Sequence, residues 1–259
     1  MGIAARLPAV FLGHGNPMNT LAQNRYTEAW RAFGESIPKP RAVVAISAHW
    51  YIQATAVTAM PFPKTIHDFR GFPPELYRVA YPAPGDPELA AALRDLLAPL
   101  RVEFDHDSWG LDHDTWSVLS HVFPGADVPV IQLSLDASKP PRYHLGLGRR
   151  LASLREQGVL VVGSGDVVHN LRLVDFQRKQ PFEWALRFDA DVKRHLREGD
   201  DQALVDYEDH PDGRLAVPTP DHYLPLLYVA GMRQPGDELT VLVEGIDFGS
   251  ISMTAYQLG

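Results

Sequence analysis

Three histidines of this chain lie at or just past the end of a short apolar run that is typical of a buried strand. They are His14, His49 and His169, and the runs before them cover residues 8–12, 42–48 and 158–163. Ligands of open α/β sheets bind at the carboxyl edge of the strands, and parallel neighbouring strands would bring His14 and His49 side by side. Neutral imidazole binds iron, zinc and copper, and two imidazoles with a third ligand leave coordination positions open. We therefore predict a catalytic metal site at this edge, with buried structural histidines as the alternative.

Two histidines have surroundings that favour acid–base chemistry. His169 follows a tight turn at residues 163–166, where glycines allow the backbone to approach a ligand closely. His113 lies between Asp112 and Asp114, whose carboxylates could stabilise an imidazolium cation. Histidine transfers protons near neutral pH with little tuning of its pKa. Both are therefore candidate acid–base residues.

Composition limits the number of domains, the types of metal ligand and the classes of partner. The 259 residues are enough for one large core, which predicts a single catalytic domain over residues 1–259. The chain has 11 histidines and no cysteine, so a metal would need nitrogen and oxygen ligands. A net charge of -8 without a basic stripe argues against a nucleic-acid partner. No signal core or membrane-length apolar run is present, which predicts a cytoplasmic enzyme without a membrane partner.

The elements that must position these histidines alternate along the chain. Helical spacing is found near residues 23–36, from Pro87, and over 143–157 and 182–196, with apolar strand patterns between them. This alternation predicts one α/β domain, with a mixed central sheet flanked by helices. The irregular, aromatic-rich segment 61–84 is expected to form a wall or lid of a site. Strands at residues 239–243 and 251–256 are expected to close the chain and could form a hairpin.

Six motifs, taken in order, resemble those of a known family. The family is the LigB-like class III extradiol ring-cleaving dioxygenases, in particular the 4,5-DOPA dioxygenase branch. The motifs are FLGHGNPM at 11–18, SAHW at 47–50, TIHDF at 65–69, LDHDTW at 111–116, GSGDVVHN at 163–170 and TPDHYLPLL at 219–227. The resemblance covers nearly the whole chain and implies a single α/β domain around a mixed sheet.

The resemblance also implies a metal-ligand set. Its motifs assign His14, His49 and His222 as metal ligands. The broader superfamily usually has a carboxylate as its third ligand, whereas this chain offers His222, with Asp221 and Glu244 as alternatives. The identity of the third ligand therefore stays open at this point.

The resemblance finally implies a reaction. A small aromatic diol such as DOPA and O2 are the expected reactants, and the product is a muconic semialdehyde. Ferrous iron is expected for ring cleavage, and zinc is possible as the bound metal. His169 is either a fourth metal ligand or the catalytic base, His113 is a second acid–base residue, and His67 is expected to contact the substrate. The alternatives are a zinc-dependent hydrolase and a non-catalytic metal- or partner-binding protein on the same fold.

Overall fold

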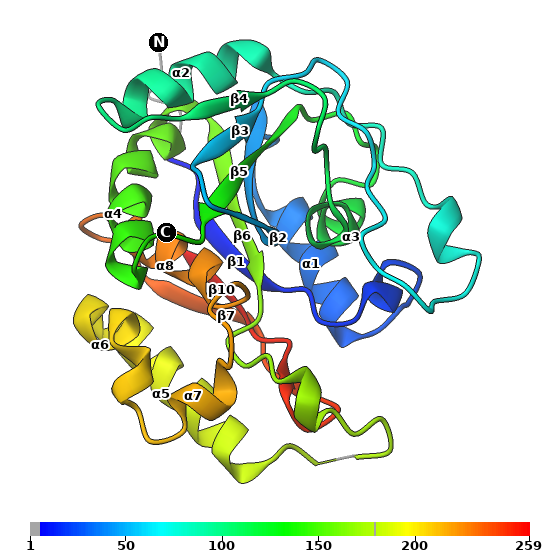
Figure 1. Cartoon of the computed structure of the whole chain (residues 1–259), viewed down its shortest axis with the longest axis vertical. Coiled ribbons are helices and arrows are strands. Elements are labelled where there is room, and N and C mark those ends of the chain that lie inside the picture. The colour runs from blue at the N-terminus through cyan, green and yellow to red at the C-terminus, as the bar shows by residue number, and fades with distance from the viewer. Residues whose placement is uncertain (1–5, 179) are drawn as a thin grey trace.

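An eight-stranded mixed sheet forms the centre of the protein (Figure 1), here described from a computed structural model covering residues 6–178 and 180–259. Its strand order is β4-β3-β5-β2-β6-β1-β10-β7. The four strands β5, β2, β6 and β1 run parallel, β10 pairs antiparallel with β1, and β7 pairs antiparallel with β10 at one edge. The strands are β1 (Ala9–Gly13), β2 (Ala42–Ile52), β3 (Ala56–Thr58), β4 (Glu103–Asp105), β5 (Val130–Asp136), β6 (Val159–Gly165), β7 (Leu239–Val243) and β10 (Ala255–Leu258).

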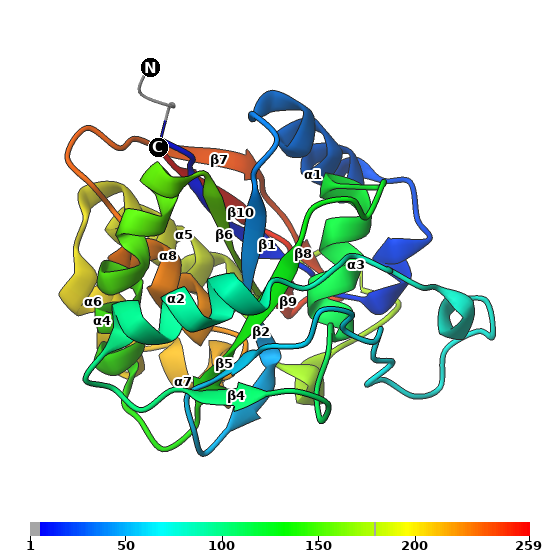
Figure 2. The same cartoon turned by 90° about the horizontal axis from the view of Figure 1, so that it is seen from above.

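Helices cover both faces of the sheet (Figure 2). On one face lie α2 (Pro87–Leu97), α4 (Pro141–Leu151) and α8 (Leu224–Gly231), and on the other lie α1 (Arg25–Ser36) and α3 (His113–Val122). The helices α5 (Glu183–Glu198), α6 (Asp201–Val205) and α7 (Gly213–Ala216) gather below α8 in Figure 1. None of the helices in the described residues is long and apolar enough to span a membrane.

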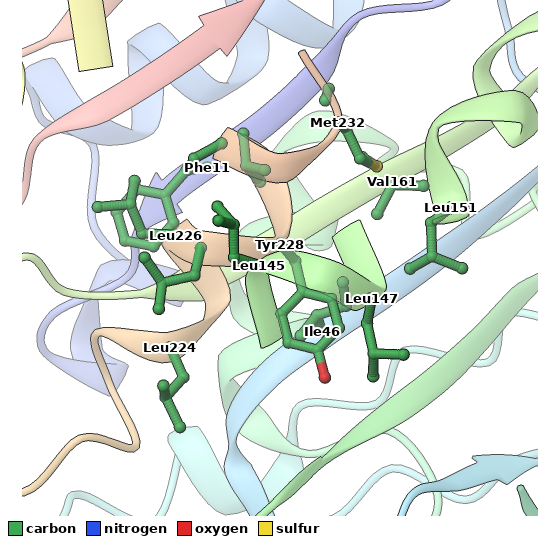
Figure 3. Packing of buried hydrophobic residues seen from close by; sticks show 14 of the residues in the cluster. Phe11, Ile46, Leu145, Leu147, Leu151, Val161, Leu224, Leu226, Tyr228 and Met232 are labelled. Carbon is green, nitrogen blue, oxygen red and sulfur yellow. The ribbon is translucent and has the colours of Figure 1, made fainter. Parts of the chain in front are cut away.

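The two-sided burial follows from the apolar runs in the sequence. Successive side chains of a strand point to opposite faces, so Phe11 packs towards α4 and α8 while Val10 and Leu12 pack towards α1 and α3. Figure 3 shows the first of these cores, in which strand residues meet the two helices; the labelled side chains include Phe11, Ile46, Val161, Leu145, Leu147, Leu226 and Tyr228. The sheet is thereby held rigidly beneath the histidines at its carboxyl edge.

The predicted fold class is confirmed, and three local expectations need correction. Strands β1 and β2 are not neighbours, because β6 lies between them. Strand β2 does not stop at His49 but continues to Ile52. The closing run 251–256 does not form one strand: Ile251–Ser252 is β9 and pairs with β8 (Ile246–Asp247), while β10 begins at residue 255 and pairs with β7. Between the two pairs the regular ladder is interrupted: the backbone N–H of Met253 donates to the carbonyl of Gly245 at 2.7 Å, and the pairing of β10 with β7 shifts register at Ala255.

Candidate metal centre

Four side chains from separate parts of the chain converge at the carboxyl edge of the sheet. They are His14, His49, Asp114 and His222, and one donor atom of each lies within 4.8 Å of the corresponding atoms of the others. The imidazole of His14 is 6.1 Å from that of His49 and 5.3 Å from that of His222, measured between ring centres. Spacing of this kind allows all four groups to share one cation.

Each histidine reaches this point by a different local structure. His14 directly follows β1, and its backbone N–H donates to the carbonyl of Gly165 at 3.3 Å. His49 lies within β2 where the pairing with β5 shifts register. An irregularity of this kind can re-aim a side chain relative to the regular alternation of a strand. His222 precedes α8, and its carbonyl accepts from the backbone N–H of Asp166 at 2.9 Å. The end of β6 therefore anchors both His14 and His222.

A hydroxyl group orients the imidazole of His14. Ser164 Oγ donates to the backbone carbonyl of Asp114 at 2.7 Å, so the same oxygen accepts from His14 Nδ1 at 3.2 Å. This tautomer leaves Nε2 of His14 unprotonated and facing the cluster. Burial, reinforced by the neighbouring His222, lowers the pKa of His14 well below its ordinary value. The imidazole is therefore neutral, as a metal ligand must be.

Carboxylates orient the other imidazoles. Asp68 accepts from His49 Nδ1 at 2.5 Å and, with its other oxygen, from His113 Nδ1 at 2.8 Å. Asp221 accepts from His222 Nδ1 at 2.5 Å. These contacts leave each Nε2 free for a cation or a reactant, and such outer partners fix ring orientation at metal sites. Burial opposes ionisation of Asp68, but the hydrogen bonds from His113 and His49 outweigh it and lower its pKa.

The electrostatics of His49 differ from those of the other ligands. Burial acts to lower its pKa, but the carboxylates of Asp114 and Asp68 outweigh burial and raise the pKa to about 10. Burial lowers the pKa of both His113 and His222. The site without a metal therefore holds its proton on His49, and a divalent cation would take the place of that proton.

Two buried carboxylates beneath the histidines lack a full set of hydrogen bonds. Asp114 Oδ1 and Asp166 Oδ2 have no hydrogen-bond donor among the described residues. Asp114 Oδ1 lies 3.0 Å from His14 Nε2, and Asp166 Oδ2 lies 3.4 Å from the same nitrogen. Burial raises the pKa of each carboxyl well above its ordinary value. Unpaired buried carboxylates are costly unless a cation is present, so this donor set fits a divalent metal ion.

His169 adds a fourth imidazole beside the cluster. Its ring stacks on that of His222, with 3.5 Å between ring centres and an interplanar angle of 7°. Its backbone N–H donates to the carbonyl of Ala216 at 2.9 Å, which fixes the chain that carries the ring. Burial, followed by the effect of His222, lowers the pKa of His169 to about 2. His169 is thus a neutral base next to the predicted ligands.

The histidines form the floor of a cavity of about 260 Å³. The apolar side chains that line it are Phe72, Leu171, Val174, Phe176, Phe248 and Ile251, and we take them to form its mouth. Phe176 is 75% exposed and packs against Phe248, with 5.1 Å between ring centres. A flat aromatic ring fits between such side chains while its polar edge reaches the imidazoles.

The structure brings most of the predicted site residues together. His14, His49, His113, His169 and His222 all line the cavity. Whether His169 is a metal ligand or the base stays open, because its donor atom falls in a group with His222 and Asp166 rather than in the group that contains His14.

His67 lies outside the set of cavity-lining residues. Its Nε2 is 2.9 Å from the carbonyl of Val79, and its ring packs on Trp116. Contact between His67 and substrate remains a prediction. The segment 61–84 reaches the site instead through Asp68 and Phe72.

The alternative third ligands have other partners. Asp221 orients His222 through Nδ1, and Glu244 forms an ion pair with Lys193 away from the cluster. The sequence pattern did not predict Asp68 and Ser164 as orienting groups or Asp114 as a donor. The LDHDTW motif could have indicated Asp114, because residues in the first turn of a helix that begins at the sheet edge lie close to a site at that edge.

Comparisons with known proteins agree with this geometry. Residues 8–257 match the family model described as the catalytic LigB subunit of aromatic ring-opening dioxygenase. The chain belongs to the LigB family. It is 50% identical over 260 residues to an Escherichia coli K12 protein named 4,5-DOPA dioxygenase extradiol, covering 99% of this chain and 96% of that one. A Beta vulgaris protein of the same name is 35% identical, covering 95% and 94% of the two chains.

A solved structure supports the same assignment. The crystal structure of an uncharacterized Escherichia coli K12 protein has a TM-score of 0.87 and 45% identity to this chain, covering 98% of this LigB-family chain and 100% of the other. The predicted family, fold and extradiol dioxygenase activity are confirmed by these relatives. They favour ring cleavage over the hydrolase and the non-catalytic alternatives.

Proposed function

We propose that this LigB-family protein opens the ring of DOPA or a closely related small catechol with O2, using ferrous iron, to give a muconic semialdehyde. The observation that carries the proposal is the convergence of three imidazoles, from His14, His49 and His222, in a cavity with an apolar mouth. Relatives named for action on DOPA support the substrate class. Zinc remains possible as the metal bound on purification, and the cytoplasm remains the location that the sequence predicts.

The roles of the residues follow from their contacts. A ferrous ion held by His14, His49 and His222 would supply Lewis-acid and one-electron chemistry to a bound catechol and O2. His169 lines the same cavity and stacks on His222, which places it to accept the proton of a catechol hydroxyl that a bound metal would make more acidic. Asp68 holds Nδ1 of His113, so Nε2 of His113 is left to take up a proton from the bound reactants and later to return it to them. The apolar mouth orients the ring and limits water.

Oxygen uptake with reconstituted protein tests the proposal. Protein purified without metal is loaded with ferrous iron or with zinc under anaerobic conditions and then mixed with DOPA and air. We expect oxygen consumption and a yellow product with iron alone. Zinc-dependent turnover without oxygen consumption, or no turnover of any catechol with iron, would contradict the proposal.

Two variants separate the metal ligands from the base. His49→Ala should lose metal, because it removes a nitrogen ligand. It also removes the hydrogen bond from His49 Nδ1 to the carboxylate of Asp68. His169→Ala should keep the metal bound by His14, His49 and His222 but lose most turnover. Measured metal content and oxygen uptake distinguish the two effects; equal metal content and wild-type rates in both variants would refute these assignments.

A further inference from the structure

We propose that Phe248 selects the ring substituent of the catechol, and that it favours an uncharged alkyl group over the charged side chain of DOPA. The inference rests on the proposed function and narrows its substrate class. It starts from the backbone of Phe248, which has a φ of 53°. Bulky residues rarely adopt this left-handed conformation, which glycine adopts without strain. Strained positions persist where neighbouring groups hold them, and they gather at sites that clamp a ligand.

The backbone around Phe248 is held by a neighbouring segment. Its carbonyl accepts from the backbone N–H of Asp175 at 3.0 Å, and the carbonyl of Gly249 accepts from that of Phe182 at 3.0 Å. A Cβ at Gly249 would lie 2.9 Å from the ring of Phe182, so the two segments are in close contact. The turn formed by residues 247–250 therefore has little freedom to relax, and the ring of Phe248 keeps its direction.

That direction brings the ring to the cavity. Phe248 is half-buried, lines the cavity and packs against Phe176, with 5.1 Å between ring centres and an interplanar angle of 59°. Three residues further on, Ile251 forms a β-bridge with His169. The turn thus joins the apolar part of the cavity to its imidazoles.

The chemistry of a catechol determines which part of it meets Phe248. Both hydroxyl groups lie on one edge of the ring, and this edge must face the imidazoles for metal binding and proton transfer. A substituent on the opposite edge, as in DOPA, then points to the apolar side chains at the mouth. The cavity of about 260 Å³ lies below the usual range of ligand pockets, about 300–1,000 Å³. It has room for a single ring, whose substituent reaches the mouth.

The mouth suits an apolar substituent. Among the described residues that line the cavity, only the histidines can carry a charge. Asn16 is the remaining polar side chain there, and its Oδ1 already accepts from the backbone N–H of Met18 at 2.9 Å. Burying an ammonium or carboxylate group without a partner is costly, because the group loses its hydration. The charged groups of DOPA must therefore stay in water, whereas an alkyl group of the same length is buried against Phe248.

Ligand binding provides the first test. Zinc-loaded protein is titrated without O2 with catechol, 4-ethylcatechol, dopamine and DOPA, which differ only in the substituent. Each methylene buried against apolar side chains strengthens binding about fourfold, so the two carbons of 4-ethylcatechol should lower Kd about 15-fold relative to catechol. The charged substituents should lower it by less than about threefold, because they stay hydrated. A Kd for DOPA equal to or below that for 4-ethylcatechol would overturn the proposal.

Substitutions at two left-handed positions separate the effect of the ring from that of the backbone. Phe248→Asn removes the ring while asparagine tolerates the positive φ, and Phe248→Leu keeps an apolar side chain. Ala126 is the other non-glycine residue with a positive φ, 48°, in the part of the chain that the structure describes, and it does not line the cavity. Ala126→Asn is therefore the control, and circular dichroism checks the folding of all three variants.

We expect Phe248→Asn to reduce the advantage of 4-ethylcatechol over catechol to less than about fourfold, the contribution of one methylene. Phe248→Leu and Ala126→Asn should keep most of it. An unchanged advantage in Phe248→Asn, or an equal loss in Ala126→Asn, would refute the role of Phe248.

Oxygen uptake by iron-loaded protein keeps this inference separate from the proposed function. KM should follow the same order as Kd, with similar kcat for the four compounds, because the substituent lies away from the reacting hydroxyl groups. A lower KM for DOPA than for 4-ethylcatechol would refute the substituent preference while ring cleavage stands. No turnover of any catechol would refute the proposed function, and the titration of zinc-loaded protein would still decide the preference.

Discussion

The glycine at the end of β6 offers a sharp test of how the sheet positions the metal centre. A Cβ at Gly165 would lie 2.2 Å from the carbonyl oxygen of His222, and real Cβ atoms essentially never approach closer than 3.0 Å. Gly165→Ala must therefore move the two segments apart by roughly 0.8 Å, a value set by that contact. The same carbonyl accepts from the backbone N–H of Asp166, so the shift is carried to the His222 ring.

The expected effect is larger on catalysis than on stability. Overpacking of this kind costs about 1–3 kcal/mol of unfolding free energy, while a misplacement of about 1 Å at a reacting site can cost on the order of 10²-fold in rate. Urea denaturation, metal content and oxygen uptake with DOPA measure the three quantities. We expect a folded protein with weakened metal binding and about 10²-fold lower turnover.

A second glycine serves as the control. A Cβ at Gly146, inside α4, would meet nothing within 4 Å, so Gly146→Ala should stabilise the protein by about 0.5–1 kcal/mol through helix propensity. Its metal content and turnover should match the wild type. Wild-type turnover and metal content in Gly165→Ala would refute the idea that the close approach of β6 to His222 positions the site.

Three further predictions concern other parts of the molecule. Burial lowers the pKa of His144 to about 4, so the unfolded state binds the extra proton below pH 6.5. His144→Gln removes this effect, and its stability gap to wild type in urea should shrink by roughly 3 kcal/mol between pH 7 and 4; a constant gap would contradict it. Arg155→Met removes the fully buried cation beside Asp237, whose carboxylate keeps only the more exposed Arg6 as an ionic partner, and should cost about 3–5 kcal/mol in thermal or urea unfolding, whereas a loss below about 1 kcal/mol would show that the pair is dispensable. Phe176→Ala removes a ring that packs against Phe248 at the cavity mouth, so steady-state kinetics should show a several-fold higher KM for DOPA with little change in kcat; a large fall in kcat would place Phe176 nearer the chemistry.

The sequence predicted the fold class because the strand runs are apolar throughout and the helices are amphipathic. Pattern alone could not give the strand order. Nothing in residues 8–12 or 42–48 indicates that β6 inserts between β1 and β2. Likewise, the pattern predicts an end of β2 at His49 because this polar residue interrupts the apolar run, yet backbone pairing continues to Ile52 across a register shift.

The site was only partly predictable for a similar reason. The histidine motifs predicted the imidazoles that could bind a metal, and those imidazoles lie together in the structure. The carboxylates that orient them come from distant segments, as Asp68 does for His49, and only the folded chain brings such pairs within hydrogen-bond distance. His67, by contrast, belongs to a matching motif but packs beside the cavity, because adjacent residues of an extended segment point in different directions.

The most direct test of the central claim is anomalous diffraction at the iron edge from crystals soaked anaerobically in ferrous ion. The account predicts one strong peak within bonding distance of Nε2 of His14, His49 and His222. A peak elsewhere, or no peak in crystals of protein that cleaves DOPA, would contradict the claim that these three imidazoles hold the catalytic metal.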